Sequence, residues 1–327
     1  MLTRDDIKGI AALPPTPCKE GQNGWDAPDS VDLDETARMI DNIIQGGGTM
    51  IGLNGTTGEC AALLFEEKRN FWATAVEAAR GRVPVFAGVT ALGTKEVIRQ
   101  MRAAKDVGCI GAFCGLPLWQ TPTLENSVQF FADLGEAVPD MPVMVYSNAM
   151  FFKSTFPVPF WAGLAKKART VITNKVTYGI DHLMMDIKVA GHQIKFMPGE
   201  TSIYPAWRMV PEHVDAMWST SAGGMGPEPW AAFMEAIHKN DDKRAGEIYS
   251  DILAVPSFFP HDEVFPGRFP NFNAQAEKYR FNASGFVKCG PSRAPYYDLP
   301  DNWKQSADAH GKGWAALRKK YAKVAAS

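Results

Sequence analysis

The sequence predicts a (β/α)8 TIM barrel followed by a C-terminal helical extension. Short apolar runs alternate with longer amphipathic segments, eight such runs occur, and after about residue 225 only helical patterns remain. Because parallel strands need a crossover connection, usually a helix, regular alternation of this kind is typical of a parallel sheet. Eight repeats over about 220 residues fit a closed barrel.

The predicted strands are short and rich in apolar and β-branched residues. They lie at Gly9–Pro14, Thr49–Leu53, Pro84–Val89, Cys109–Leu116, Pro142–Tyr146, Val171–Val176, Ile194–Met197 and Ala216–Ser219. An open, doubly wound α/β sheet is the structural alternative, since it has the same alternation. That fold usually carries a G-x-G-x-x-G turn after an early strand, and this sequence has none in that place.

Helical patterns lie between the runs, and their ends carry typical start and stop residues. The clearest cover Asp34–Gln45, Phe65–Ala79, Thr94–Val107 and Leu124–Ala137. Asp32 or Asp34 can cap the first of these, and the three glycines after it can end it. We expect Thr94 and Thr123 at the starts of two others.

Beyond the last predicted strand the chain reads as helices joined by a Pro- and Phe-rich loop. The helical patterns cover Trp230–Lys239, Lys243–Leu253, Ala274–Phe286 and Asp301–Ala325, with the loop from Pro256 to Pro270. No linker of flexible composition separates this part from the barrel. We therefore expect residues 1–225 to form the barrel and active site, and residues 226–327 to pack on the barrel or on a neighbouring subunit.

Composition argues against several classes of function. The formal net charge is −2 and basic residues occur singly or in pairs, so no nucleic-acid partner is expected. No stretch approaches the roughly 20 apolar residues of a membrane span. The five cysteines form no C-x-x-C pair and the charged N-terminus has no apolar signal core, which predicts free thiols and a cytoplasmic location. The six histidines show no H-x-H or H-x-x-x-H spacing, so no metal is expected.

The predicted sixth strand carries Lys175 within an apolar, β-branched run. Desolvation disfavours the ammonium form, so a lysine buried there can present a neutral amine. Such an amine is the nucleophile that forms Schiff bases with carbonyl substrates. The alternative is a lysine at a strand end whose amine reaches solvent.

Other polar residues follow the predicted strands, where the active site of a TIM barrel lies. After the second strand comes a turn with Thr56 and Thr57 between two glycines, which can aim hydroxyls and N–H groups at a carboxylate. The alternative is an ordinary turn in which Thr57 or Glu59 caps the next helix. The fifth strand ends at Tyr146, a possible acid–base group or a packing residue. After the eighth strand, a small-residue loop is expected to leave room for a ligand.

Together these residues are similar to those of the dihydrodipicolinate synthase and N-acetylneuraminate lyase family of class I aldolases. GTTGE at Gly55–Glu59, Tyr146 and Lys175 occur in the family's order and near its spacing. The resemblance implies that Lys175 forms the Schiff base, that Tyr146 relays protons, and that Thr56 and Thr57 bind the pyruvyl carboxylate. It also implies a homotetramer and no cofactor beyond the covalent imine.

Two stretches depart from the synthases of that family. Pro117–Gln120 replaces a tyrosine pair, and Met150–Lys153 lacks an arginine that grips a second carboxylate. Both changes make the predicted pocket more aromatic and argue against dihydrodipicolinate synthesis.

The sequence more closely resembles the benzylidenepyruvate hydratase-aldolases, which act on intermediates of the bacterial degradation of polycyclic aromatic hydrocarbons. The shared stretches include TARMIDNII, GECAALLFEEKRNF, GRVPVFAGVTAL, EVIRQ, VQFF, PFWAGL and GFVKCGPSRAPYY. Thr57 stands where the naphthalene-type enzymes have an aromatic residue, and the NKVTYG context of Lys175 also departs from that type. The resemblance therefore implies trans-2′-carboxybenzalpyruvate, an intermediate of phenanthrene degradation, as substrate, giving pyruvate and 2-carboxybenzaldehyde. The alternative is trans-o-hydroxybenzylidenepyruvate, giving pyruvate and salicylaldehyde.

Candidates for binding the aryl ring are Trp119, Phe151, Phe152 and Trp218, with Asn273 and Gln275 in the extension as contacts to the ring substituent. Ordinary core packing is the alternative for each aromatic residue. A non-catalytic keto-acid-binding barrel is the alternative from another class of function, although a binding protein needs neither Lys175 nor Tyr146. A sugar-acid lyase would need a more polar pocket.

Overall fold

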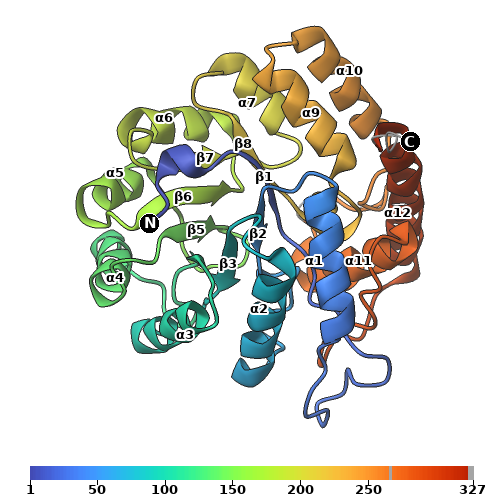
Figure 1. The fold of residues 1–327 in the computed structure, drawn as a ribbon, viewed down its shortest axis with the longest axis horizontal. Coiled ribbons are helices and arrows are strands. Elements are labelled where there is room, and N and C mark those ends of the chain that lie inside the picture. Colours follow the sequence, from blue (N-terminus) through green and yellow to red (C-terminus); the bar gives the residue numbers. More distant parts are fainter. Residues whose placement is uncertain (265–266, 323–327) are drawn as a thin grey trace. The chain divides into compact units, whose positions relative to one another are not determined.

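A computed structural model of the chain describes residues 1–264 and 267–322. Eight strands belong to one parallel sheet and alternate with helices, and four further helices follow (Figure 1), so the predicted (β/α)8 TIM barrel with a helical extension is confirmed.

By its internal contacts the chain divides into two compact units. The first comprises Met1–Gly9 and Pro84–Trp218, and the second comprises Ile10–Val83 and Ser219–Ser327. The boundary at residue 225, drawn on a different basis, stays a prediction.

All eight strands coincide with the predicted runs to within a few residues. They are β1 (Gly9–Ala12), β2 (Met50–Gly52), β3 (Val85–Gly88), β4 (Gly111–Cys114), β5 (Val143–Ser147), β6 (Val171–Val176), β7 (Lys195–Met197) and β8 (Ala216–Ser219).

The helices between the strands follow a short 3-10 turn, η1 (Arg4–Asp6). They are α1 (Leu33–Gln45), α2 (Phe65–Ala79), α3 (Thr94–Asp106), α4 (Leu124–Ala137), α5 (Val158–Lys167), α6 (Ile180–Ala190) and α7 (Ile203–Met209). After β8 come α8 (Thr220–Gly224), α9 (Glu228–His238), α10 (Asp242–Leu253), α11 (Phe269–Ser284) and α12 (Asp301–Tyr321). As predicted, Asp32 caps α1 by accepting from the N–H of Glu35 at 2.9 Å, and Thr123 caps α4.

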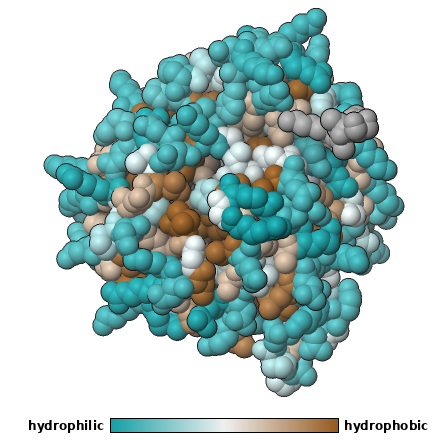
Figure 2. Space-filling model, viewed as in Figure 1, coloured by the Kyte–Doolittle hydropathy of each residue, from teal (hydrophilic) through white to brown (hydrophobic). Residues whose placement is uncertain are grey.

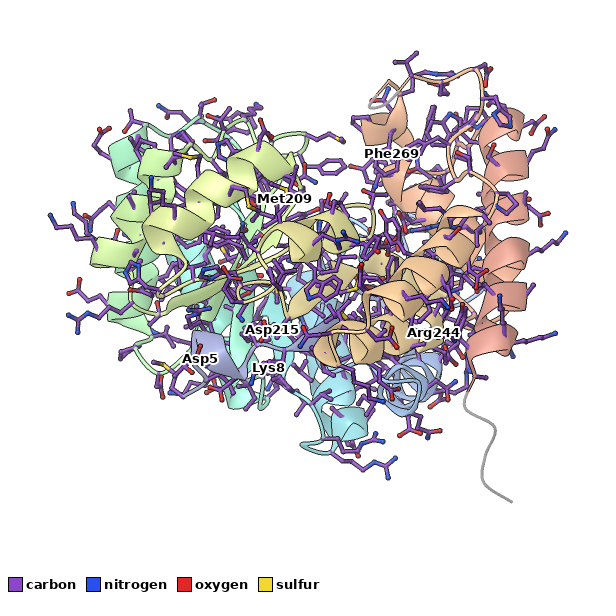
Figure 3. All side chains as sticks on the ribbon, turned by 90° about the horizontal axis from the view of Figure 1, so that it is seen from above. Asp5, Lys8, Met209, Asp215, Arg244 and Phe269 are labelled. Carbon is purple, nitrogen blue, oxygen red and sulfur yellow. The ribbon has the colours of Figure 1, made fainter. Side chains whose placement is uncertain are left out.

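In the first unit, strands β3 to β7 are successive neighbours, and helices α3 to α6 lie outside them (Figure 1). The rim that these helices form is mostly hydrophilic in Figure 2. Every residue of β6 is buried, because one face meets the helices and the other faces the barrel interior. The chain's start also belongs to this unit: the N–H of Gly9 donates to the carbonyl of Asp215 at 2.9 Å, and Lys8 and Asp215 are labelled near each other in Figure 3.

In the second unit, β1 pairs with β2 in parallel register, and helices α11 and α12 lie side by side (Figure 1). An aromatic cluster lies under the loop before α11, with Phe258 and Trp303 buried and Phe269, labelled in Figure 3, stacked on the Trp303 ring at 6.2 Å. This cluster joins the loop to α11 and α12. In the described ranges, no helix combines the length and apolar character that a membrane crossing requires.

Two segments differ from the prediction. Helix α11 begins at Phe269 rather than Ala274, because Pro270 stands in the first turn, where a missing N–H costs no helical hydrogen bond. The predicted open loop after β8 is instead the short buried helix α8. Its glycines serve packing: a Cβ at Gly223 would lie 2.5 Å from the carbonyl carbon of Leu13, and one at Gly224 would lie 2.4 Å from the ring of Phe281. The end of the last predicted helix falls partly outside the described residues.

Candidate active site

Lys175 lies near the C-terminal end of β6 with only 5% of its surface exposed. It is paired in register with Tyr146 of β5, so the two side chains leave neighbouring strands on the same face. The amine Nζ lies 4.4 Å from the centroid of the Tyr146 ring and 3.6 Å from that of Trp218. Two aromatic faces therefore flank the amine. The buried position predicted for this lysine is confirmed.

Tyr146 is held by two phenylalanines. Its ring stacks on Phe113 with centroids 4.8 Å apart and meets the ring of Phe152 edge-on at 5.1 Å. Such pairs stabilise beyond the area that they bury. The sequence pointed to both Phe151 and Phe152 as aromatic pocket residues; Phe152 is the one against Tyr146, while Phe151 is half-buried.

Trp218 occupies β8 and is fixed by a hydrogen bond from its indole Nε1–H to the carbonyl of Val176, at 2.6 Å. Gly199 makes room for the indole, because a Cβ there would lie 2.7 Å from the ring. Strand β6 is tied to β5 beside the lysine, since the Ser147 hydroxyl donates to the carbonyl of Lys175 at 2.9 Å. The first unit thus assembles an amine, a phenol and an indole from three strands.

The opposite face of β6 carries a buried polar group that the sequence did not single out. The amide of Asn174 donates to the Tyr178 hydroxyl at 3.2 Å, and His182 Nδ1 lies 3.0 Å from Oδ2 of Asp186. Burial raises the pKa of Asp186 to about 6. Burial and the nearby Asp186 charge raise the pKa of the Tyr178 phenol well above its ordinary value.

In the second unit, Thr56 and Thr57 lie in the turn that follows β2. Thr57 is buried and Thr56 partly exposed. Neither Thr57 nor Glu59 caps the next helix: α2 has Leu64 at its N-cap, whose N–H donates to Glu67 at 2.8 Å. The alternative of an ordinary helix-capping turn therefore does not hold.

The turn is instead joined to distant parts of the second unit. The Glu59 carboxylate accepts from Lys278 of α11 at 2.9 Å and from Arg293. Both partners lie more than 200 positions away in the sequence, so no local pattern pointed to them.

The remaining predicted substrate contacts are less uniform. Trp119 is 79% exposed, in the loop after β4. On α11, Asn273 is 7% exposed, and its Oδ1 has no hydrogen-bond partner among the described residues. The amide of Gln275 donates to the carbonyls of Asn271 and Asp298, both at 3.2 Å. Substrate binding by Trp119, Asn273 and Gln275 stays a prediction.

Comparison with known proteins places the chain in a family. A family model described as the dihydrodipicolinate synthetase family matches residues 22–257. The chain belongs to this family. The family resemblance that the sequence analysis predicted from Lys175, Tyr146 and the GTTGE turn is thereby confirmed.

Curated relatives match almost the whole chain. The trans-O-hydroxybenzylidenepyruvate hydratase-aldolase of Pseudomonas putida is 40% identical over 98% of this chain and 97% of its own length. The trans-2′-carboxybenzalpyruvate hydratase-aldolase of Nocardioides sp. (strain KP7) is 34% identical over 98% and 96%. A solved structure described as "PhdJ bound to substrate intermediate" has a TM-score of 0.94 at 32% identity, covering 98% of this chain and 99% of that one. The predicted enzyme class, a carbon–carbon lyase of the hydratase-aldolase type, is thereby confirmed.

Among residues 1–264 and 267–322, no group of three or more His, Cys, Asp or Glu side chains could hold a metal ion. The expectation that the covalent imine is the only prosthetic chemistry stays a prediction.

Proposed function

We propose that this family member hydrates and cleaves an aryl-substituted benzylidenepyruvate through an imine on Lys175. The observation that carries the proposal is the buried amine between two aromatic rings, at 3.6 and 4.4 Å. Desolvation of an ammonium group costs several kcal/mol. The attraction of a cation to a ring face is worth about 2 kcal/mol when desolvated, so burial favours the neutral, nucleophilic amine.

The reaction begins when the Lys175 amine attacks the ketone of the substrate and water leaves, giving a protonated imine conjugated with the C3–C4 double bond. The imine withdraws electrons from C4, where water adds as hydroxyl while C3 takes a proton. Tyr146, one strand away in register, is the proposed acid–base group for the hydroxyl.

Cleavage then uses the same imine. Removal of the C4 hydroxyl proton breaks the C3–C4 bond, the aromatic aldehyde leaves, and the bonding electrons pass into an enamine. Protonation at C3 and hydrolysis of the imine release pyruvate and regenerate the amine. Thr56 and Thr57 are the proposed ligands of the pyruvyl carboxylate, and Trp218 the proposed contact of the bound substrate.

We propose trans-o-hydroxybenzylidenepyruvate as the substrate, giving salicylaldehyde. The sequence analysis favoured the carboxyl-substituted compound instead. The relative that acts on the hydroxyl compound by its name is 40% identical, against 34% for the relative named for the carboxyl compound, which supports the hydroxyl alternative. A homotetramer remains part of the proposal by family habit.

Borohydride reduction in the presence of pyruvate tests the imine. We expect a stable adduct on Lys175 in the peptide map and none on Lys195, a matched control that is also buried in a strand but whose amine is bonded to Asp215. The Lys175→Arg variant should give neither adduct nor carbon–carbon cleavage. An absent adduct in the wild type, with keto acid still bound, would instead indicate a binding protein.

The ring substituent is tested by kcat/KM for hydroxyl- and carboxyl-substituted benzylidenepyruvates side by side, followed as release of each aldehyde. We expect the hydroxyl compound to be preferred. A preference for the carboxyl compound would overturn that part of the proposal and leave the imine intact.

A further inference from the structure

Glu59, the last residue of the GTTGE turn, is an uncommon residue in its setting. Its carboxylate is fully buried, and its backbone adopts a left-handed φ of 54°, which residues other than glycine rarely adopt. A buried carboxylate is stable only when it is paired and hydrogen-bonded. The conformation of the turn therefore depends on the groups that satisfy this carboxylate.

Arg293 donates hydrogen bonds to both oxygens of the Glu59 carboxylate. Its backbone N–H donates to Oε1 of Glu59 at 2.8 Å, and its guanidinium donates to Oε2. The remaining guanidinium N–H groups donate to the loop between β1 and α1: to the Thr16 carbonyl at 3.0 Å, the Pro17 carbonyl at 2.9 Å, and the hydroxyl and carbonyl of Ser30 at 2.7 and 3.3 Å. The planar guanidinium group has five N–H donors and can make all of these hydrogen bonds, whereas a lysine ammonium group has only three donors.

Lys278 is the second cation on Glu59. Its side chain is 2% exposed, and its amine donates to Oε2 of Glu59 at 2.9 Å and to the Pro291 carbonyl at 2.7 Å. Glu67 adds a second buried carboxylate, since it accepts from the N–H and hydroxyl of Ser30, the same hydroxyl to which Arg293 donates. Two cations and two carboxylates thus form one balanced buried network.

The other end of the turn is held by uncharged groups. Asn54 also has a left-handed φ, of 47°, and its amide accepts from the Trp72 indole at 2.6 Å and donates to the Thr16 hydroxyl at 3.0 Å. That hydroxyl donates to the Gly58 carbonyl at 2.7 Å. Both ends of the Asn54–Glu59 turn are therefore fixed, and Thr56 and Thr57 lie between them.

We propose that Lys278 and Arg293 are positioning residues that hold the GTTGE turn in the conformation in which Thr56 and Thr57 bind the substrate carboxylate. This inference rests on the proposed function. Lys278 and Arg293 lie outside residues 22–257, the part that the family model matches. The C-terminal extension thereby takes part in setting the geometry of a turn that belongs to the matched region.

A double-mutant cycle tests the proposal, with the pyruvate concentration for half-maximal borohydride trapping at Lys175 as the readout. Thr57→Val removes one proposed carboxylate ligand, and Lys278→Met removes one support of the turn. A misplacement of about 1 Å can cost on the order of 100-fold, so we expect each single variant to raise the half-maximal concentration by about 10- to 100-fold. The double variant should be no worse than the more impaired single variant, because both changes disable the same contact.

Arg280→Met is the matched control. Arg280 is also a buried cation of α11, but its guanidinium donates to Glu277 and Thr220 and lies beside His310, so none of its hydrogen bonds reaches the turn. When Arg280→Met is combined with Thr57→Val, the two fold-changes in half-maximal concentration should multiply, because the two changes are independent. If Lys278 had a purely structural role, the effects of Lys278→Met and Thr57→Val would multiply in the same way.

Circular dichroism and thermal melting establish that each variant is folded. If Lys278→Met is not, the cycle is run with Arg293→Lys, which keeps the charge but has three donors in place of five. Multiplicative effects, or an unchanged half-maximal concentration, would overturn the positioning role while the wild-type adduct upheld the imine. A wild type without any adduct would overturn the imine and the role of the turn together.

Discussion

Replacing Gly115 by alanine should disturb Tyr146 through Phe152. A Cβ at Gly115, just after β4, would lie 2.0 Å from Cζ of the Phe152 ring. Carbon atoms in contact stand about 3.5–4.0 Å apart, so the ring must withdraw by roughly 1.5 Å. That ring meets Tyr146 edge-on at 5.1 Å, and its displacement removes one of the two rings that hold the phenol.

The magnitude follows from overpacking, which costs about 1–3 kcal/mol. For 327 residues, an unfolding entropy of about 2.1 cal/mol/K per residue gives roughly 0.7 kcal/mol/K. The melting temperature should therefore fall by roughly 1.5–4.5 °C. Because misplacing a catalytic group can cost up to about 100-fold, we expect kcat for aldehyde release to fall by about 10- to 100-fold.

Differential scanning calorimetry and aldehyde release measure the two effects. Gly93→Ala is the control, since a Cβ there has no atom within 4 Å. A second change, Phe152→Leu, gives the new methyl room, so the double variant should melt higher than the sum of the single effects predicts. If Gly115→Ala matched Gly93→Ala in both melting temperature and kcat, the ring contact would have no part in holding Tyr146.

Three further predictions concern other groups. Because the folded-state pKa of Asp186 is raised to about 6, its contribution to stability is greatest below about pH 4 and is lost as pH rises to about 6; melting curves of Asp186→Asn should lack that decline, and an identical decline would contradict the assignment. Burial raises the pKa of Cys109 to about 12 and that of Cys289 further, so mass spectrometry should find neither thiol labelled by iodoacetamide at pH 8 until the protein is unfolded. Trp218→Phe removes the indole donor to the Val176 carbonyl and should lower kcat by about tenfold for about 1.4 kcal/mol lost; a drop no greater than twofold would show that the indole's orientation is unimportant.

The strands and the buried lysine could be predicted because their signals are local. A short β-branched run has few alternatives to a buried strand, and a lysine within it is conspicuous. Because neighbouring strands run parallel, their C-terminal ends lie at one rim, and Tyr146 and Lys175 were therefore expected together. The structure pairs the two residues in register. Nothing in this step needed contacts distant in sequence.

Loop residues could not be predicted in the same way, because no period fixes their direction. Phe151 and Phe152 are adjacent and chemically alike, and only the structure shows which ring meets Tyr146. Trp119 was chosen by residue type, but it lies in an irregular loop and is largely exposed. The glycines after β8 suggested open space, whereas close packing against Leu13 and Phe281 is what requires them.

Helix α11 shows a further limit of pattern reading, because burial there does not follow residue type. Glu277, Lys278 and Arg280 are all buried, although charged residues on a helix normally mark its solvent face. Their burial is made possible by partners: Arg280 pairs with Glu277 three positions away, while Lys278 pairs with Glu59 219 positions away. Removing one partner from such a pair leaves an unpaired buried charge, at a cost of about 3–5 kcal/mol. Substitutions on this polar face should therefore be tolerated as poorly as substitutions in an apolar core. Through Lys278 the same face contacts Glu59, in the turn that carries Thr56 and Thr57, the predicted carboxylate ligands.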